Sequence, residues 1–306
     1  MIKKLWVEKY RPSTLDGYVF TDDKMKKTIQ RWISEKDIPH VLLSGSPGTG
    51  KTTLAKILIN SLDVNDVDVL EINASRENSV DDIRYKITNF CQSMPWGDFK
   101  IILLDEADYL SLSAQAALRG VMEQYASVIR FILTCNFKNK INPPVQSRCQ
   151  SFSIVNLDIT EFTVRVAEVL NAEQIEYDLE VLDLYVRSCY PDLRKTINSI
   201  QLNIVDNKLV YTTNNESTAD YKFKILELFK TGKLTEARKF VCTNLPGDEY
   251  ENFYRFLYEN LDLITKDTHK QDEIILVIRD GLYKHNLIAD AEINLSATMI
   301  QIMDIL

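Results

Sequence analysis

Eight residues near the start of the chain have the types and spacing to hold the phosphates of a nucleotide. They are Gly45-Ser46-Pro47-Gly48-Thr49-Gly50-Lys51-Thr52, a G-x-x-x-x-G-K-T pattern. Glycines let backbone amides converge on phosphate oxygens, the Lys51 ammonium would reach the β- and γ-phosphates, and the Thr52 hydroxyl would bind Mg²⁺. A glycine turn that matches by accident is the alternative. The apolar run His40–Ser44 before the pattern and the helical spacing of Thr53–Ile59 after it favour a site for a nucleoside triphosphate.

A pair of carboxylates follows the most apolar run of the first half. Asp105 and Glu106 come directly after Lys100–Leu104, which has the composition of a fully buried parallel strand. Asp105 would hold the Mg²⁺ hydration shell, and Glu106 would orient or deprotonate an attacking water. Two acidic residues that merely close a strand are common. The phosphate loop about fifty residues upstream favours the catalytic interpretation.

Three further polar residues have chemistry that suits phosphoryl transfer. Asn136, just past a strand predicted over Val128–Leu133, is equally well a water-positioning amide or a turn residue. Arg148 precedes another predicted strand, and Arg194 opens a predicted helix. A guanidinium stabilises the charge of the transferring phosphoryl group, yet spacing alone favours ordinary surface arginines at both positions.

Strand-like and helix-like segments alternate over the first 156 residues, which predicts an α/β fold with a parallel five-stranded sheet covered by helices on both faces. The predicted strands are 40–44, 68–73, 100–104, 128–133 and 150–155, and the predicted helices between them include 79–91, capped by Ser79, and 112–125. From Asp158 onward the strand signals fade. Helices are predicted at 159–170, 179–188 and from Pro191, then a polar linker at Tyr211–Asp220 and an all-helical remainder.

The composition is that of an ordinary globular protein. The chain has 306 residues, 26% of them charged, and a formal net charge of −8, which argues against a generally basic nucleic-acid coat but leaves room for a local basic track. No apolar run approaches a membrane span, and residues 1–4 open no signal-like core. Five scattered cysteines without C-x-x-C fit a reduced, cytoplasmic protein without structural zinc.

Several motifs, in order along the chain, resemble those of AAA+ ATPases and specifically of sliding-clamp loader subunits. They are Trp6–Pro12 (W-V-E-K-Y-R-P), Asn73-Ala74-Ser75, Leu118-Arg119 with Met122-Glu123, Ser147-Arg148-Cys149 and Pro191–Lys195 (P-D-L-R-K). These motifs are similar to those of replication factor C small subunits. The S-P-G-T-G-K-T-T loop, the L-R-x-x-M-E-x-Y helix and the P-D-L-R-K-T-I helix look closest to the large ATPase subunit of T4-type phage loaders. The resemblance is dense over residues 5–205 and thin afterward.

The resemblance implies roles for the matching positions. Asn136 becomes the sensor-1 residue, Arg194 the sensor-2 arginine, Arg148 the finger that reaches a neighbour's ATP, and Asn73 a polar switch that restrains the catalytic glutamate. Residues expected to contact the nucleotide are Val7, Tyr10, Arg11, Pro12, Gly45, Ser46, Pro47, Gly48, Thr49, Gly50, Lys51, Thr52, Thr53 and Arg194. Residues expected to face DNA phosphates are Ser75, Arg76, Arg84, Ser111, Ser113 and Gln115. From the residues alone, Arg76 and Arg84 fit a solvated helix face better.

The family also implies three domains and a reaction cycle. We expect an ATPase domain at 1–156, a helical lid at 157–210 and a helical collar at 211–306. The subunit would work in a heteropentamer with other loader subunits, using ATP and Mg²⁺ to open a sliding clamp and release it on primer–template DNA, in the host cytoplasm if phage-encoded. Ser46 and Gly120 depart from the pattern, since cellular loaders have proline and a second arginine there, and the zinc-binding cysteines of bacterial loaders are absent. An AAA+ helicase or branch-migration motor is the principal alternative. A non-enzymatic scaffold subunit and a small nucleotide kinase fit less well.

Overall fold

A computed structural model describes residues 5–76, 80–210, 225, 228, 233–244, 250–285 and 287–306. The predicted cap Ser79 and the predicted linker Tyr211–Asp220 lie outside the described residues. The chain divides into two compact units, one of Met1–Phe162 with Pro191–Lys195 and one of Thr163–Tyr190 with Thr196–Leu306. The finer division into ATPase domain, lid and collar stays a prediction.

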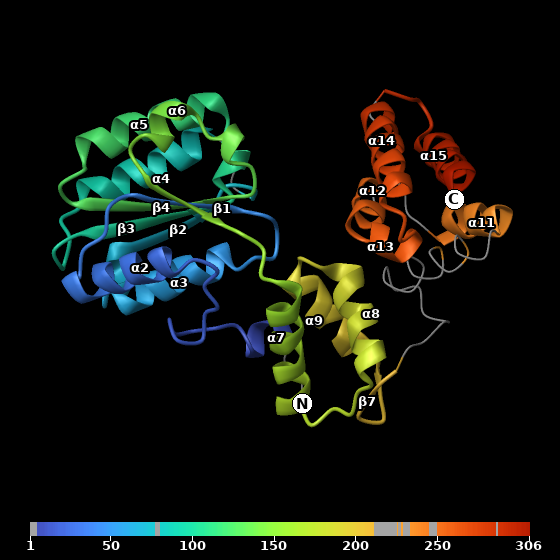
Figure 1. Cartoon of the computed structure of the whole chain (residues 1–306). Helices are drawn as coiled ribbons and strands as arrows, with labels where there is room; N and C mark the ends of the chain where they lie inside the picture. The colour runs from blue at the N-terminus through green and yellow to red at the C-terminus, as the bar shows by residue number, and fades with distance from the viewer. Residues whose placement is uncertain are drawn as a thin grey trace. The chain divides into compact units, whose positions relative to one another are not determined.

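The first unit is built on a five-stranded parallel sheet, as the alternating pattern predicts. Its strands are β1 (Val41–Gly45), β2 (Val69–Asn73), β3 (Lys100–Asp105), β4 (Ile129–Cys135) and β5 (Gln150–Ile154), in the spatial order β2-β3-β4-β1-β5. Helices cover both faces (Figure 1), and they are α2 (Asp23–Glu35), α3 (Lys51–Ser61), α4 (Val80–Gln92), α5 (Leu112–Gln124) and α6 (Pro143–Gln146), with the short α1 (Trp6–Lys9) before them. The α/β fold class is confirmed.

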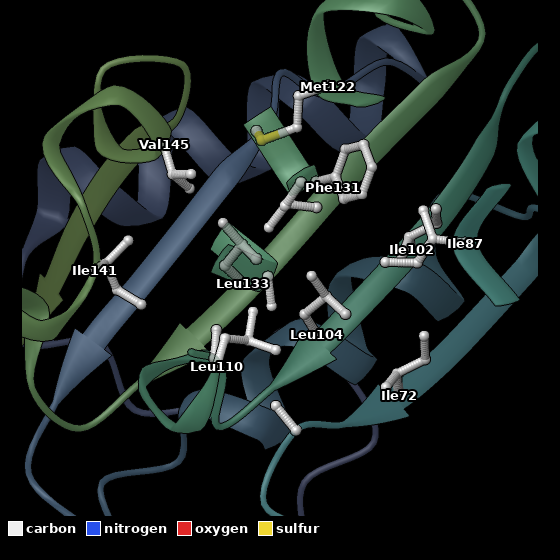
Figure 2. Close-up of a cluster of buried hydrophobic side chains, with 14 of the residues drawn as sticks. Ile72, Ile87, Ile102, Leu104, Leu110, Met122, Phe131, Leu133, Ile141 and Val145 are labelled. Atoms are coloured by element: carbon white, nitrogen blue, oxygen red, sulfur yellow. The ribbon is translucent and has the colours of Figure 1, made fainter. Parts of the chain in front are cut away.

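The central strands β1, β3 and β4 bury both of their faces, which is why they are nearly continuous apolar runs, whereas the edge strands β2 and β5 are only partly buried. Leu104 and Leu133 point to the α4 and α5 side, where they pack with Met122 and Ile87 (Figure 2), and Leu42 belongs to the same cluster. Alternate residues of the same strands point to the other side and join this set from α2 and α3: Met25, Ile29, Trp32, Leu54 and Leu58. Because parallel strands all end at one edge, the residues after β1, β3 and β4 meet there.

The second unit is mainly helical. Its helices are α8 (Leu179–Cys189), α11 (Leu234–Asn244), α12 (Tyr250–Glu259), α13 (Leu261–Ile264), α14 (Thr268–His285) and α15 (Ala291–Ile305), while α7 (Ile159–Ala172) and α9 (Leu193–Leu202) extend from one unit into the other. Phe253, Tyr254 and Leu257 of α12 are fully buried against α14 and α15. A two-stranded antiparallel hairpin, β6 (Ile204–Val205) and β7 (Lys208–Leu209), also occurs here. The sequence analysis missed it because each strand has only two residues.

Candidate functional site: a phosphate loop and an acidic pair at the sheet edge

The phosphate loop leaves the end of β1 and enters α3. Gly50 caps α3 with φ +88°, and Gly48 has φ +76°, a left-handed conformation that favours glycine. A Cβ at Gly48 would collide with the carboxylate of Asp192, and one at Gly50 would come within 3.1 Å of the Tyr18 ring. Glycine is therefore required at both positions. The first amides of α3, like those of any helix, have no acceptor within the helix and can bind an anion.

Lys51, the lysine of the phosphate loop, is buried, and carbonyl oxygens of the loop hold its ammonium. Nζ donates to the carbonyl oxygens of Gly45 and Ser46 at 2.8 and 2.7 Å. Burial lowers the pKa of Lys51, and the charge of Arg194 adds to this, while Cys135, Asp108 and Asp105 oppose it. A cation in this position is poised to meet phosphate oxygens.

The two acidic residues stand at the carboxyl end of β3, beside the loop. Asp105 Oδ1 accepts hydrogen bonds from the hydroxyls of Thr52 at 2.8 Å and Thr134 at 2.6 Å. The amide of Glu106 donates to the same Thr134 hydroxyl at 3.0 Å. Glu106 itself has φ +58° and ψ +42°, a left-handed conformation that is uncommon outside glycine. A carboxylate and a hydroxyl side by side form a donor set that fits Mg²⁺, which typically takes few protein oxygens and completes its shell with water and phosphate.

Asn136 lies just past β4, at the same edge. The backbone amides of Asn136 and Phe137 donate to Asp108 Oδ2 at 3.3 and 3.2 Å. Asp108 is 8% exposed, and its other oxygen, Oδ1, is buried without a hydrogen-bond partner in the described part of the chain. Asp108 thus fixes the backbone at the position where the sequence predicts a sensor.

Asn73 ends β2 directly beside Asp105 of β3. Its Oδ1 accepts from the amide and hydroxyl of Ser75, at 3.0 and 2.6 Å, and from the amide of Arg76 at 3.3 Å. The side chain therefore caps the turn that leads toward α4. In this conformation its carbonyl oxygen is engaged by that turn, so a switch role would require the turn to rearrange.

Arg148 lies at the opposite edge of the sheet. Gln150, two residues later, pairs with Val41 at the start of β1, whereas the phosphate loop follows the end of β1. The Arg148 guanidinium contacts the Glu123 carboxylate, the Pro144 carbonyl and the Ser147 hydroxyl. With about 3.3 Å of rise per strand residue, the length of β1 separates Arg148 from its own phosphate loop by roughly 15 Å.

Residues from outside the sheet complete the surroundings of the loop. Arg11 Nε donates to the Thr53 hydroxyl at 3.2 Å, which brings the segment after α1 to the first turn of α3. Val7, Tyr10 and Pro12 are half-buried in the same segment. Arg194, in the first turn of α9, is exposed and near enough to Lys51 to influence its pKa.

The residues expected at DNA have different placements. Ser75, Arg76, Ser111 and Ser113 are exposed, and Ser111 caps α5 through a hydrogen bond from the Ala114 amide at 3.2 Å. Arg84 belongs to α4, but its side chain lies outside what the structure describes. Gln115 requires a correction.

Gln115 is 2% exposed and uses its amide group inside the protein. Nε2 donates to the carbonyls of Leu110 and Lys140 at 3.0 Å each, and Oε1 accepts from the Asn142 amide at 2.7 Å. A side chain whose polar atoms are satisfied in this way joins loops and does not face phosphates. The helix N-terminus pattern suggested exposure, but the residue lies on the inner face of α5.

Sequence reasoning missed three residues of the site. Thr134 is a buried polar residue within an apolar strand, and Asp108 is one next to the acidic pair. No spacing rule marks either residue as part of a site. Tyr18 packs its ring against Gly50 and, edge-on, against Phe20 at 4.9 Å between centroids. Burial raises the pKa of the Tyr18 hydroxyl. A lone aromatic between Gly17 and Val19 carries no sequence signal for this contact.

Comparison with known proteins bears on this geometry. Residues 41–157 match the model of the ATPase family associated with various cellular activities (AAA). The chain is 38% identical over 247 residues to the replication factor C small subunit of Methanococcus vannielii, covering 78% of each. It is 34% identical over 307 residues to that of Saccharolobus solfataricus, covering 96% of this chain and 93% of the relative.

Among solved structures, the Thermotoga maritima RuvB Holliday junction branch migration motor is similar, with a TM-score of 0.54. The match is 17% identical and covers 72% of this chain and 79% of that one. At this identity the likeness shows a shared fold. Across the described ranges, no helix has the length and apolar character needed to cross a membrane.

Proposed function

Because the chain belongs to the replication factor C small-subunit family of AAA ATPases, we propose that this ATP hydrolase is a catalytic subunit of a sliding-clamp loader. In this proposal, ATP bound between neighbouring subunits joins them into a spiral that opens the clamp. Primer–template DNA then completes the catalytic geometry, and hydrolysis releases the closed clamp on DNA. In this proposal, clamp loading takes place in the cytoplasm.

One chain supplies most of the chemistry. Backbone amides of the loop and the Lys51 ammonium bind and orient the β- and γ-phosphates. Glu106 positions the attacking water and takes up its proton, while Thr52 and Asp105 would hold Mg²⁺. Bound Mg²⁺ neutralises charge that develops on the phosphate oxygens. Arg11 and the half-buried residues Val7, Tyr10 and Pro12 are suited to line the adenine side, since Arg11 reaches the start of α3.

The position of Arg148 is the observation that carries the shared-site proposal. Arg148 stands at the amino edge of the sheet, and Glu106 at the carboxyl edge. An arginine from this position reaches a γ-phosphate only if that phosphate belongs to a neighbour. Arg148 Nη1 donates to the Pro144 carbonyl and the Ser147 hydroxyl, and Nη2 donates to Glu123. Among the described residues, the Nε–H and the second hydrogen of Nη2 therefore have no acceptor. These donors are available for an incoming phosphate.

The second unit has features that suit assembly with other subunits. Leu276 and Tyr283 lie seven residues apart on α14 and are 55% and 72% exposed. Ile293 and Ile300 have the same spacing on α15 and are 65% and 39% exposed. Residues seven apart share one helix face, and exposed apolar faces of this kind typically mark protein interfaces. This supports the proposed collar.

DNA contact is proposed for the exposed helix-entry residues. Ser75 and Arg76 precede α4, and Ser111 and Ser113 open α5. Amides and hydroxyls at helix N-termini bind phosphate without reading bases, which suits a loader that accepts any primed site. A branch-migration motor is less well supported, because the similarity to RuvB is at the level of fold, whereas the replication factor C relatives align over most of their length.

The test is ATP turnover of the assembled loader with DNA, clamp, both or neither. We expect the greatest stimulation when primed DNA and clamp are present together. Arg148→Ala should leave nucleotide binding nearly intact and cut the stimulated turnover about a thousandfold. Full turnover in Arg148→Ala would exclude the shared site. Stimulation by DNA alone, with unwinding of a duplex, would favour a motor.

A further inference from the structure

One buried hydroxyl joins the two acidic residues of the site. Thr134 is 1% exposed and sits in β4 between the buried Leu133 and Cys135. Its Oγ1 lies 2.6 Å from Asp105 Oδ1 and 3.0 Å from the backbone nitrogen of Glu106. The register of the sheet explains this contact, since Leu104 of β3 pairs with Leu133 of β4, and the next residue of each strand is Asp105 and Thr134.

The direction of both hydrogen bonds is fixed by chemistry. A backbone N–H can only donate, so the Thr134 oxygen must accept from Glu106. An ionised carboxylate can only accept, so the single hydroxyl proton of Thr134 must go to Asp105. The hydroxyl therefore connects the carboxylate proposed to face the metal to the backbone of the proposed catalytic glutamate.

The backbone that Thr134 holds is strained. Glu106 has a left-handed conformation, with φ +58°, which persists only where surrounding contacts maintain it. The described contacts that bear on this residue include the Glu106 amide bond to Thr134 and a bond from the Tyr109 amide to the Glu106 carbonyl at 3.0 Å. Loss of the hydroxyl would remove the acceptor of the Glu106 amide, the backbone donor of the strained residue itself.

We propose that Thr134 is a positioning residue for ATP hydrolysis, acting through Asp105 and Glu106. If the Thr52 hydroxyl, which donates to Asp105 Oδ1 at 2.8 Å, turned toward a bound Mg²⁺, Thr134 would still hold that oxygen in place. Asp105 Oδ2 would then be available to the water shell of the Mg²⁺, and the backbone of Glu106, from which its carboxylate extends, would stay in place. This inference rests on the proposed function of the acidic pair.

The test compares Thr134→Ser, which keeps the hydroxyl, with Thr134→Val, which keeps the shape and loses it. Turnover of the assembled loader with primed DNA and clamp, its Mg²⁺ dependence, and ADP binding without metal are measured for each. Loss of such a supporting partner typically costs about 10- to 100-fold in activity or metal affinity. We expect that loss in Thr134→Val, a shift to higher Mg²⁺ for half-maximal rate, unchanged metal-free ADP binding, and a rate within about threefold of wild type in Thr134→Ser.

Two controls keep the outcomes distinct. Thr298→Val removes another buried hydroxyl, one that donates to the Asn294 carbonyl in α15, and should leave the Mg²⁺ dependence unchanged. Glu106→Gln tests the acidic pair itself: undiminished hydrolysis in this variant would refute the proposed function. If Glu106→Gln is inactive but Thr134→Val and Thr134→Ser behave alike, only the role of Thr134 is refuted. Should Thr134→Val fail to fold, Thr134→Cys, whose thiol is a weak donor, replaces it and must fall below Thr134→Ser.

Discussion

At the residue scale, Arg148 is held by partners of its own chain. Glu123, near the end of α5, accepts from Arg148 and also from Arg119, whose Nε lies 3.2 Å away. The hydrogen bond from Arg119, and after it the one from Arg148, lower the pKa of the Glu123 carboxyl, which therefore stays ionised. A charge-assisted hydrogen bond of this kind orients a guanidinium more firmly than a neutral acceptor does.

We therefore predict that Glu123→Ala slows the stimulated turnover of the assembled loader about tenfold, since Arg148, the proposed finger, would lose the carboxylate that orients its guanidinium but keep its charge. Nucleotide binding should not change. In an Arg148→Ala background, Glu123→Ala should have no further effect. Glu35→Ala is the matched control, because Glu35 also pairs with an arginine four residues earlier, Arg31, at 3.9 Å. A faster Glu123→Ala enzyme would mean that the carboxylate restrains Arg148 and does not aim it.

Residues with a motif could be predicted from the sequence, and residues without one could not. The placement of Gly48, Lys51, Thr52 and Asp105 at one edge of the sheet follows from their spacing, because a loop between a strand and a helix and a carboxylate after a buried strand both leave recognisable patterns; their roles stay predictions. Thr134 could not be predicted, since its role depends on which residue of β3 lies beside it. The inward orientation of Gln115 depends on the rotation of α5, which a capping pattern leaves open.

At the element scale, α5 contains Gly120, a position where no neighbouring atom would exclude a side chain. A Cβ at Gly120 would meet no atom within 4 Å, whereas glycine in a helix interior costs about 0.5–1 kcal/mol relative to alanine. Gly120→Ala should therefore raise the free energy of unfolding by about that amount, measured by denaturant titration. Gly281→Ala in α14 is the contrasting variant, since its Cβ would lie 2.5 Å from the Thr298 hydroxyl and 2.8 Å from the Tyr254 ring. It should destabilise by about 1–3 kcal/mol. Equal effects of the two variants would contradict the packing described for both helices.

The amino edge of the sheet contains a titratable contact. His40 Nδ1 accepts a hydrogen bond from the Phe131 amide at 3.1 Å, so this nitrogen must be unprotonated. Burial and the charge of Arg130 lower the pKa of His40 below its ordinary value of about 6.5. Because the unfolded chain binds this proton more readily, the stabilising contribution is complete above about pH 6.5 and is lost as pH falls toward the folded-state pKa.

His40→Asn should reduce this pH dependence, because the amide oxygen replaces the acceptor without titrating. Thermal unfolding at pH 7.5 and pH 5.5 measures it, and the wild type should lose more stability on acidification than the variant. His269→Asn, at a histidine near the start of α14, serves as the control. An identical acid response of wild type and His40→Asn would contradict the assignment.

The order of strands and helices was predictable where burial is complete. Strands β1, β3 and β4 appear as continuous apolar runs because helices cover both of their faces, and their predicted ranges differ from the observed ones by one or two residues. The α2 helix was not predicted, although Met25, Ile29 and Trp32 form its buried face. The hairpin of β6 and β7 is too short for periodicity to register, and its turn is made by Asp206 and Asn207 with positive φ.

At the scale of the whole molecule, the separation of Arg148 from the phosphate loop would make each subunit incomplete if Arg148 acts as proposed on a neighbour's ATP. The loop, Asp105 and Glu106 share one edge of the sheet, and Arg148 stands at the other. Such a head-to-tail arrangement uses two different surfaces of one chain, which generates rings or spirals. Catalysis would then depend on assembly, and clamp and DNA would act by closing the seam between neighbours.

Complementation between two inactive variants tests this central claim most directly. Glu106→Gln subunits keep Arg148, and Arg148→Ala subunits keep Glu106, so each alone should be nearly inactive in the loader. When they are mixed in equal amounts before assembly, roughly a quarter of the head-to-tail interfaces should combine an intact Glu106 with a neighbour's intact Arg148. We expect the stimulated ATP turnover to recover in proportion to those interfaces. A mixture no more active than its separate components, or an Arg148→Ala enzyme with full activity, would show that one chain encloses the complete site.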